Sequence, residues 1–249
     1  MSTSVATPDA ASPSTSRRGQ LRALLRTTHP RQALAIAVVV GLLVALMGRP
    51  PREWLVSAAA VLVVQLALGL VDDLVDVTED SQTQAAGKPL ASGAVPRGNA
   101  TYALAVLLLL AVPLSLQNGI VAGLVLLATF VVGVVHDRWL HRTPLSFVGW
   151  AASFALLTAF VSYGGWGREA EGSAPVTQFA VLAAVLGVLV HFLVALPDLV
   201  TDNRGTVRHL PLRIALRTGA PKLFAVTVAL TVGVVAAMVW TALTAGIAR

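Results

Sequence analysis

The sequence predicts an all-α membrane protein, a polytopic bundle of transmembrane helices. Hydrophobic residues make up 56% of its 249 residues and charged residues only 12%, whereas an average soluble domain contains about 25% charged residues. The mean hydropathy is +0.77. Uncharged apolar stretches recur along the chain, and each is long enough for an α-helix to cross a hydrocarbon core about 30 Å thick. This composition excludes an ordinary water-soluble domain.

Seven of these stretches predict seven membrane-spanning helices. They are rich in Val, Leu and Ala and lack the alternation of polar and apolar residues that is typical of membrane β-barrel strands. The predicted spans are Gln32–Gly48, Trp54–Val71, Ala100–Leu116, Gly119–Val135, Leu145–Gly165, Val176–Leu196 and Leu223–Ile247. No linker between them is long enough to separate two folded domains, so residues 21–249 are expected to form one transmembrane domain.

The first 20 residues differ in composition from the rest of the chain. Ser, Thr, Ala and Pro dominate them and they contain no apolar run, which predicts a disordered tail rather than a signal peptide. The chain contains no cysteine, which excludes disulfides, thiolate metal sites and cysteine nucleophiles.

The basic residues predict an orientation in the cell membrane. With the N-terminus in the cytoplasm, most of the 18 Lys and Arg residues fall in cytoplasmic segments, in agreement with the positive-inside rule. The long connections 72–99, 136–146 and 197–222 then lie on the cytoplasmic side too. Because topology explains the net charge of +6, no nucleic-acid partner is predicted, and the lipid bilayer is the expected surroundings.

Five of the 12 acidic residues lie between positions 72 and 80. If the second helix continues through this stretch, Asp72, Asp76 and Asp80 share one helix face, with Asp73 beside them. Like charges at this spacing repel one another unless a cation neutralises them. Because Mg²⁺ prefers carboxylate, water and phosphate oxygens, the stretch predicts a platform for divalent metal ions.

A second carboxylate pair, Asp198 and Asp202, follows the sixth predicted span on the same side of the membrane. Two metal platforms that face each other are suited to holding one diphosphate, and fixed cations would bind its remaining oxygens. The candidate cations are Lys88, Arg142, Arg204 and Arg208. The alternative interpretation is that the acidic residues only form a solvated helix end.

His191 is a polar residue within the sixth predicted span. It is a candidate acceptor contact or general base, because ionisable groups inside a membrane often mark a functional site. The alternative is an imidazole that bonds to a neighbouring backbone carbonyl.

These motifs resemble the UbiA superfamily of intramembrane prenyltransferases. The family's first signature, Asn-Asp-x-x-Asp-x-x-x-Asp, is similar to Asp72-Asp73-Leu-Val-Asp76-Val-Thr-Glu-Asp80, with Asp72 in place of Asn. The family's basic-Pro-x-x-Ser-Gly turn resembles Lys88-Pro-Leu-Ala-Ser-Gly93, with Lys88 where Arg is commoner.

The rest of the resemblance lies further along the chain. The family's middle segment, Tyr-x-x-x-x-Lys-Arg-Thr, is similar to His136-Asp-Arg-Trp-Leu-His-Arg-Thr143, where Arg142 is kept and His136 and His141 differ. The second signature, Asp-x-x-x-Asp followed by a Leu-Pro turn, resembles Asp198–Asp202 and His209-Leu-Pro211. Members of the family usually have nine spans, whereas this sequence predicts seven.

The resemblance implies a membrane prenyltransferase. Such an enzyme moves a prenyl group from a prenyl diphosphate to an aromatic or hydroxyl acceptor and releases pyrophosphate. The implied cofactor is Mg²⁺, and the implied metal ligands are Asp72, Asp73, Asp76, Asp80, Asp198 and Asp202, of which Asp73, Asp76, Asp198 and Asp202 are the implied catalytic residues. Two alternatives stay open: a cation-binding membrane transporter and a catalytically inactive UbiA-like protein.

Overall fold

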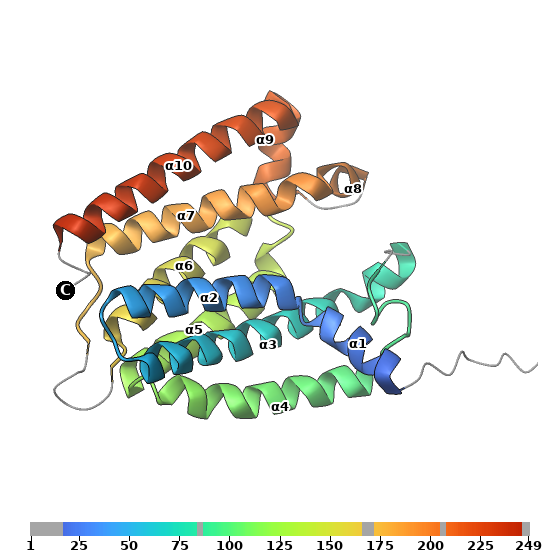
Figure 1. The fold of residues 1–249 in the computed structure, drawn as a ribbon. Helices are drawn as coiled ribbons and strands as arrows, with labels where there is room; N and C mark the ends of the chain where they lie inside the picture. The colour runs from blue at the N-terminus through green and yellow to red at the C-terminus, as the bar shows by residue number, and fades with distance from the viewer. Residues whose placement is uncertain (1–16, 84–86, 166–171, 205–207, 246–249) are drawn as a thin grey trace, which may run out of the picture.

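The structure, a computed structural model, describes residues 17–83, 87–165, 172–204 and 208–245. The described residues form helices joined by turns and loops, as Figure 1 shows. The elements are α1 (Arg17–Thr27), α2 (Pro30–Leu46), α3 (Pro51–Thr83), α4 (Arg97–Leu116), α5 (Ile120–Val135), the π-helical turn η1 (His136–Leu140), α6 (Ser146–Tyr163), α7 (Thr177–Ala195), the 3₁₀ turn η2 (Leu196–Asp198), α8 (Leu199–Arg204), α9 (Leu210–Thr218) and α10 (Ala220–Thr244).

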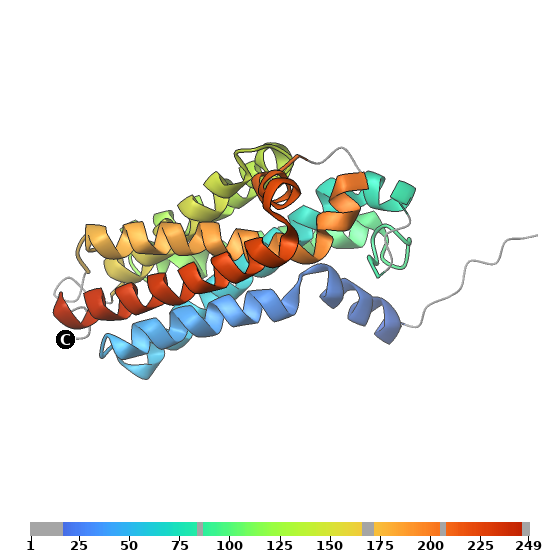
Figure 2. The ribbon, with the colours of Figure 1, turned by 90° about the horizontal axis from the view of Figure 1, so that it is seen from above.

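The long helices form one antiparallel bundle. Each packs against the next along the chain from α2 to α7, and α10 then packs against α7. Helix α3 also contacts α5, and α2 also contacts α6, so the first half of the chain closes around α3. Figures 1 and 2 show the long helices lying side by side. The predicted all-α bundle is confirmed.

The helices have the length and hydropathy of membrane spans. Six helices of the described chain are long and apolar enough to cross a membrane, and the count is seven if the bent pair α1 and α2 forms one span. Large apolar side chains cover the outside of the bundle, where Leu109 is 76% and Trp240 70% exposed. Because such exposure is unfavourable in water, the outer surface fits the hydrocarbon core of a bilayer.

A dense core holds α2, α3, α5 and α6 together. Val44, Val61 and Leu126 are fully buried, and Phe160 reaches them from α6. A second cluster lies at the far end of α3, where Leu70 packs with Leu90 of the following loop. The two clusters fix α3 along its length, so the acidic stretch at its end starts from a rigid support.

Helices α1 and α2 meet at a bend of 58°. The bend lies at Thr28 and His29, and His29 has a left-handed backbone with φ of 47°. Pro30 opens α2 at a position where its missing N–H costs no hydrogen bond. Gly69 of α3 has no Cβ, and this lets the Thr28 backbone approach α3 closely. The bend therefore brings His29 beside the start of the acidic stretch.

Several helix ends differ from the sequence prediction. Helix α3 does not end at Val71 but continues to Thr83, as the helical interpretation of the acidic stretch required. The span that begins at Ile120 continues through η1 to Leu140, because the chain widens into a π-turn instead of leaving the membrane at Val135. Of the expected N-terminal tail, residues 1–16 lie outside the described residues and residues 17–20 belong to α1.

Candidate diphosphate and metal site

The first acidic cluster lies on α3 near the end of the bundle where α5 and α7 also end. Asp73 is buried, with only 3% of its side chain exposed, whereas Asp72 is half-exposed. The Nε2 atom of His29 lies 3.7 Å from Asp72 Oδ2 and 3.5 Å from Asp73 Oδ1. The donor atoms of these three residues all lie within 4.8 Å of one another. They form the one group in the described chain close enough to hold a metal ion.

Lys88 reaches this cluster from the loop after α3. Its Nζ atom lies 3.8 Å from Asp73 Oδ1. The loop folds back through backbone hydrogen bonds, in which Ser92 N donates to Lys88 O and Val95 N donates to Pro89 O. Val95 is buried against the second core cluster. The loop therefore holds the ammonium group next to the buried carboxylate.

Arg142 joins the cluster from the connection after η1. Its Nη2 atom donates to Asp76 Oδ1 at 3.3 Å, and its Nε atom donates to His141 Nε2 at 2.8 Å. The carbonyl of Arg142 accepts a hydrogen bond from the backbone N–H of Arg208 at 3.1 Å. Arg142 thus links the first acidic cluster to the segment that precedes α9.

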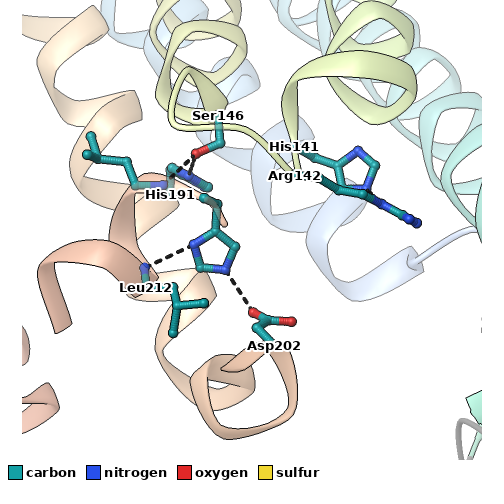
Figure 3. Close-up of polar contacts among 8 residues, drawn as sticks. His141, Arg142, Ser146, His191, Asp202 and Leu212 are labelled. Atoms are coloured by element: carbon teal, nitrogen blue, oxygen red, sulfur yellow. Dashed lines mark hydrogen bonds and ion pairs between the residues drawn. The ribbon is translucent and has the colours of Figure 1, made fainter. Parts of the chain in front are cut away.

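The second acidic pair is split between two short elements. Asp198 ends η2 and is exposed, and among the described residues it has no hydrogen bond or ion pair. Asp202 lies in α8 and its Oδ2 atom is 2.8 Å from His209 Nε2. The other ring nitrogen of His209 accepts the N–H of Leu212 and so caps α9 (Figure 3).

A row of aromatic rings crosses the space between the two acidic clusters. His141 and His136 lie 6.4 Å apart between ring centroids, and His136 and His191 lie 6.2 Å apart. His191 and His209 are also 6.2 Å apart. With Arg142 at one end and Asp202 at the other, the row forms a chain of contacts from the first acidic cluster to the second.

The first cluster has the chemistry that a Mg²⁺ ion requires. Asp73 Oδ1 is fully buried and has no hydrogen-bond partner. The contacts of this oxygen with His29 and Lys88, at 3.5 and 3.8 Å, are ion pairs without a hydrogen bond, and a buried charged group that lacks a hydrogen bond costs about 1–3 kcal/mol or more. A bound cation removes this cost, and carboxylate oxygens are ligands that Mg²⁺ prefers. Asp72, Asp73 and Asp76 therefore fit the ion, while the imidazole of His29 suits it less well.

The sequence-predicted residues are only partly brought together. Asp72, Asp73, Asp76, Lys88 and Arg142 gather at one cluster, and Arg208 is near Arg142 through its backbone. Arg204 lies elsewhere: it lines a small hollow between α8, α9 and α10. Asp80 lies in the last turns of α3, and its side chain is outside the described residues.

Three residues of the site were not predicted from the sequence. His29 precedes the first predicted span, and only the bend before Pro30 brings it to α3. Ser146 is equally remote in sequence, since it lies 45 positions before His191, whereas His209 follows Asp202 by only seven positions. For the two histidines the local signal was the residue type, since histidine is rare in such an apolar chain, which has five. His191 was predicted as an acceptor contact or general base, and it bonds to Ser146 rather than to a backbone carbonyl.

Comparisons with known proteins identify the family of the chain. A sequence model of the UbiA prenyltransferase family matches residues 33–248. The chain belongs to the UbiA prenyltransferase family. The family match begins in α2 and extends past α10, so it includes both acidic clusters and the histidine row. No curated protein sequence matches.

A solved structure from a study of digeranylgeranylglyceryl phosphate synthase in membranes has the same fold. Its TM-score to this chain is 0.59 at 17% sequence identity. The similarity covers 86% of this chain and 76% of the other. At this identity the likeness establishes the UbiA-type helical bundle and not the substrate. The protein is thus a multi-pass membrane protein with the fold and family of the prenyltransferases.

Proposed function

We propose that this protein transfers a prenyl group from a prenyl diphosphate to an aromatic or hydroxyl acceptor and releases pyrophosphate. The strongest support is the position of Asp73, whose buried Oδ1 atom has no hydrogen-bond partner and lies 3.8 Å from Lys88 Nζ, at the end of the bundle that also carries the second acidic pair. This end combines carboxylates for metal ions with cations for phosphate oxygens, next to apolar helices suited to a prenyl chain.

The site residues have two proposed roles: carboxylates bind Mg²⁺, and cationic side chains contact phosphate oxygens. Asp72, Asp73 and Asp76 would bind Mg²⁺ on the first motif. Mg²⁺, when bound, supplies positive charge that stabilises the leaving pyrophosphate. We propose that Asp80, Asp198 and Asp202 complete the two metal platforms and that Lys88, Arg142, Arg204 and Arg208 contact phosphate oxygens.

We also propose that the N-terminus and this end of the bundle face the cytoplasm. The basic residues of α1, of the loop after α3 and of α9 all lie at this end, as the positive-inside rule requires. The diphosphate then enters from the cytoplasmic water while its prenyl chain stays in the bilayer.

Binding of a prenyl diphosphate tests the metal platform. Asp73→Asn and Asp76→Asn remove negative charge with little change in shape, so each is expected to weaken Mg²⁺-dependent binding of geranylgeranyl diphosphate by tenfold or more, which is about 1.4 kcal/mol. Binding is measured on purified protein by titration with Mg²⁺ present and with Mg²⁺ chelated.

The matched control is Glu53→Gln, which removes a carboxylate from the opposite end of the same helix. This variant is expected to bind like the unchanged protein. Binding that does not need Mg²⁺, or that is unchanged in both Asp variants, contradicts the proposal. Pyrophosphate release then separates a working enzyme from a cation transporter and from an inactive UbiA-like protein.

A further inference from the structure

Four of the five histidines lie together at the proposed active-site end. We call them the histidine array: His136, His141, His191 and His209. They come from η1, the connection after it, α7 and the residue that caps α9. No single helix explains this gathering, because four separate segments each contribute one imidazole. His191 and His209 are buried, His136 and His141 only half-buried. Because ionisable side chains within a membrane protein are costly and usually functional, the array indicates a function.

The centre of the array is held by specific packing. His191 is 7% exposed, and its Nε2 atom lies 2.8 Å from the hydroxyl oxygen of Ser146. The ring of Trp150 stacks on His191 at 5.6 Å and meets His136 edge-on at 6.3 Å. Gly149 leaves room for His136, because a Cβ atom there would lie 2.6 Å from its Nδ1 atom. Helix α6 thus holds both rings in place, and Figure 3 shows His191 beside Ser146.

The array has hydrogen-bonding capacity that the chain itself does not use. The Nδ1 atoms of His136 and His141 are buried and have no hydrogen-bond partner among the described residues. The rings are too far apart for a ready metal site, since the only group with donor atoms within 4.8 Å in the described chain is the one at His29. An organic ligand that forms hydrogen bonds with the imidazole nitrogens therefore fits the array better than a metal ion does.

The charge of the array indicates the class of ligand. Imidazole rings and the Ser146 hydroxyl exchange hydrogen bonds with neutral hydroxyl groups, whereas a carboxylate requires a cation. The guanidinium of Arg142 contacts the array through His141, and it already bonds to the carboxylate of Asp76. The array therefore suits an alcohol or a phenol better than an acid.

We propose that the histidine array is the acceptor side of the active site and that it takes a hydroxyl-bearing acceptor, an alcohol or a phenol. The inference rests on the proposed function. The acceptor oxygen bonds to C1 of the prenyl group while the bond from C1 to the diphosphate oxygen breaks. The bonding electron pair leaves with pyrophosphate, and the hydroxyl proton passes to the imidazole of His191.

The test uses the full chain with Mg²⁺, geranylgeranyl diphosphate and three small acceptors: benzyl alcohol, phenol and benzoate. Water competes with them and gives geranylgeraniol. The unchanged protein is expected to form the benzyl or phenyl ether in preference to the benzoate ester, with saturation in the alcohol. Products are separated by chromatography and identified by mass, and released pyrophosphate is measured in the same samples.

Two substitutions separate proton transfer from binding of the acceptor. His191→Gln keeps a side chain able to bond to Ser146 but accepts no proton, so ether formation is expected to fall about 100-fold. Ser146→Ala is expected to raise the KM for the alcohol about fivefold to tenfold through the loss of a hydrogen bond. In both variants the KM for the diphosphate stays unchanged. Ser115→Ala is the control, because Ser115 is also a fully buried serine but lies on α4 away from the array.

Each outcome decides between the two proposals. Absence of any pyrophosphate release contradicts the proposed function, and the inference fails with it. Pyrophosphate release that yields geranylgeraniol alone, or more benzoate ester than ether, overturns the hydroxyl acceptor but leaves the prenyl diphosphate site standing. A parallel loss of diphosphate affinity in His191→Gln and Ser146→Ala assigns the array to the diphosphate instead and also overturns the inference.

Discussion

At the scale of single residues, two glycines determine how closely the elements that carry the histidine array can pack. Gly149 faces His136, and Gly187 lets α7 lie against the backbone of Trp150, where a Cβ atom would be 2.5 Å from the carbonyl oxygen. Neither glycine terminates a helix, since both lie inside α6 and α7. Their value is the close approach that they permit between elements.

Gly149→Ala is expected to displace His136 and to destabilise the protein by about 1–3 kcal/mol. The added Cβ would lie 2.7 Å from the Cβ of His136, so rotation of the side chain gives no relief and the π-turn itself has to move. Thermal unfolding in detergent and ether formation measure the two effects. The control is Gly233→Ala in α10, where a Cβ meets nothing within 4 Å; an equal loss in both variants contradicts the expectation.

The candidate site was predicted only where its signal is local in sequence. The spacing of Asp72, Asp73 and Asp76 on one helix was readable because three residues on one face need no tertiary information. Lys88 and Arg142 were predicted as cations of the site, but their contacts with particular carboxylates were not, and His29, which reaches the cluster through a bend, was not predicted at all. Contacts between distant segments depend on packing that no short pattern contains.

At the scale of elements, the bend between α1 and α2 is coupled to the acidic stretch of α3. Gly69 precedes Asp72 by less than one helical turn and lies under the backbone of Thr28. The bend places His29 within 3.7 Å of Asp72 and 3.5 Å of Asp73. A substitution of Gly69 is therefore expected to change the surroundings of the carboxylates although Gly69 does not contact them.

Gly69→Ala is expected to separate the bend from α3, because a Cβ there would lie 2.6 Å from the carbonyl oxygen of Thr28. Backbone atoms cannot turn aside as a side chain does. The expected result is a lower unfolding temperature together with altered Mg²⁺ affinity, measured by thermal unfolding and by metal titration. Gly98→Ala in α4 has open space around it and is expected to change neither.

Helix existence was predictable, whereas helix ends were not. Apolar length alone gave the spans, because a helix must satisfy its backbone hydrogen bonds inside a bilayer. The ends depend on other features: α3 continues past Val71 where its carboxylates meet cationic partners, and η1 continues α5 with a π-turn. Hydropathy falls at both places although the helix does not stop.

At the scale of the whole molecule, the absence of cysteine allows the orientation to be measured directly. Ser92→Cys adds one thiol to the loop after α3, and Gln117→Cys adds one to the turn between α4 and α5 at the other end. Both positions are exposed. A membrane-impermeant maleimide is expected to label Gln117→Cys in intact cells and Ser92→Cys only in permeabilised cells. The reverse pattern contradicts the proposed orientation.

The gathering of the charged site residues at one end of the bundle has a consequence for the direction of the reaction. In the proposed reaction, pyrophosphate is released at the water-facing ends of α3 and α7, while the prenylated product remains dissolved in lipid. The two products then occupy different phases and meet again only rarely. Hydrolysis of pyrophosphate in the water phase then removes this product irreversibly. Because the two products are separated between water and lipid, the reverse reaction is slow and the transfer is effectively irreversible.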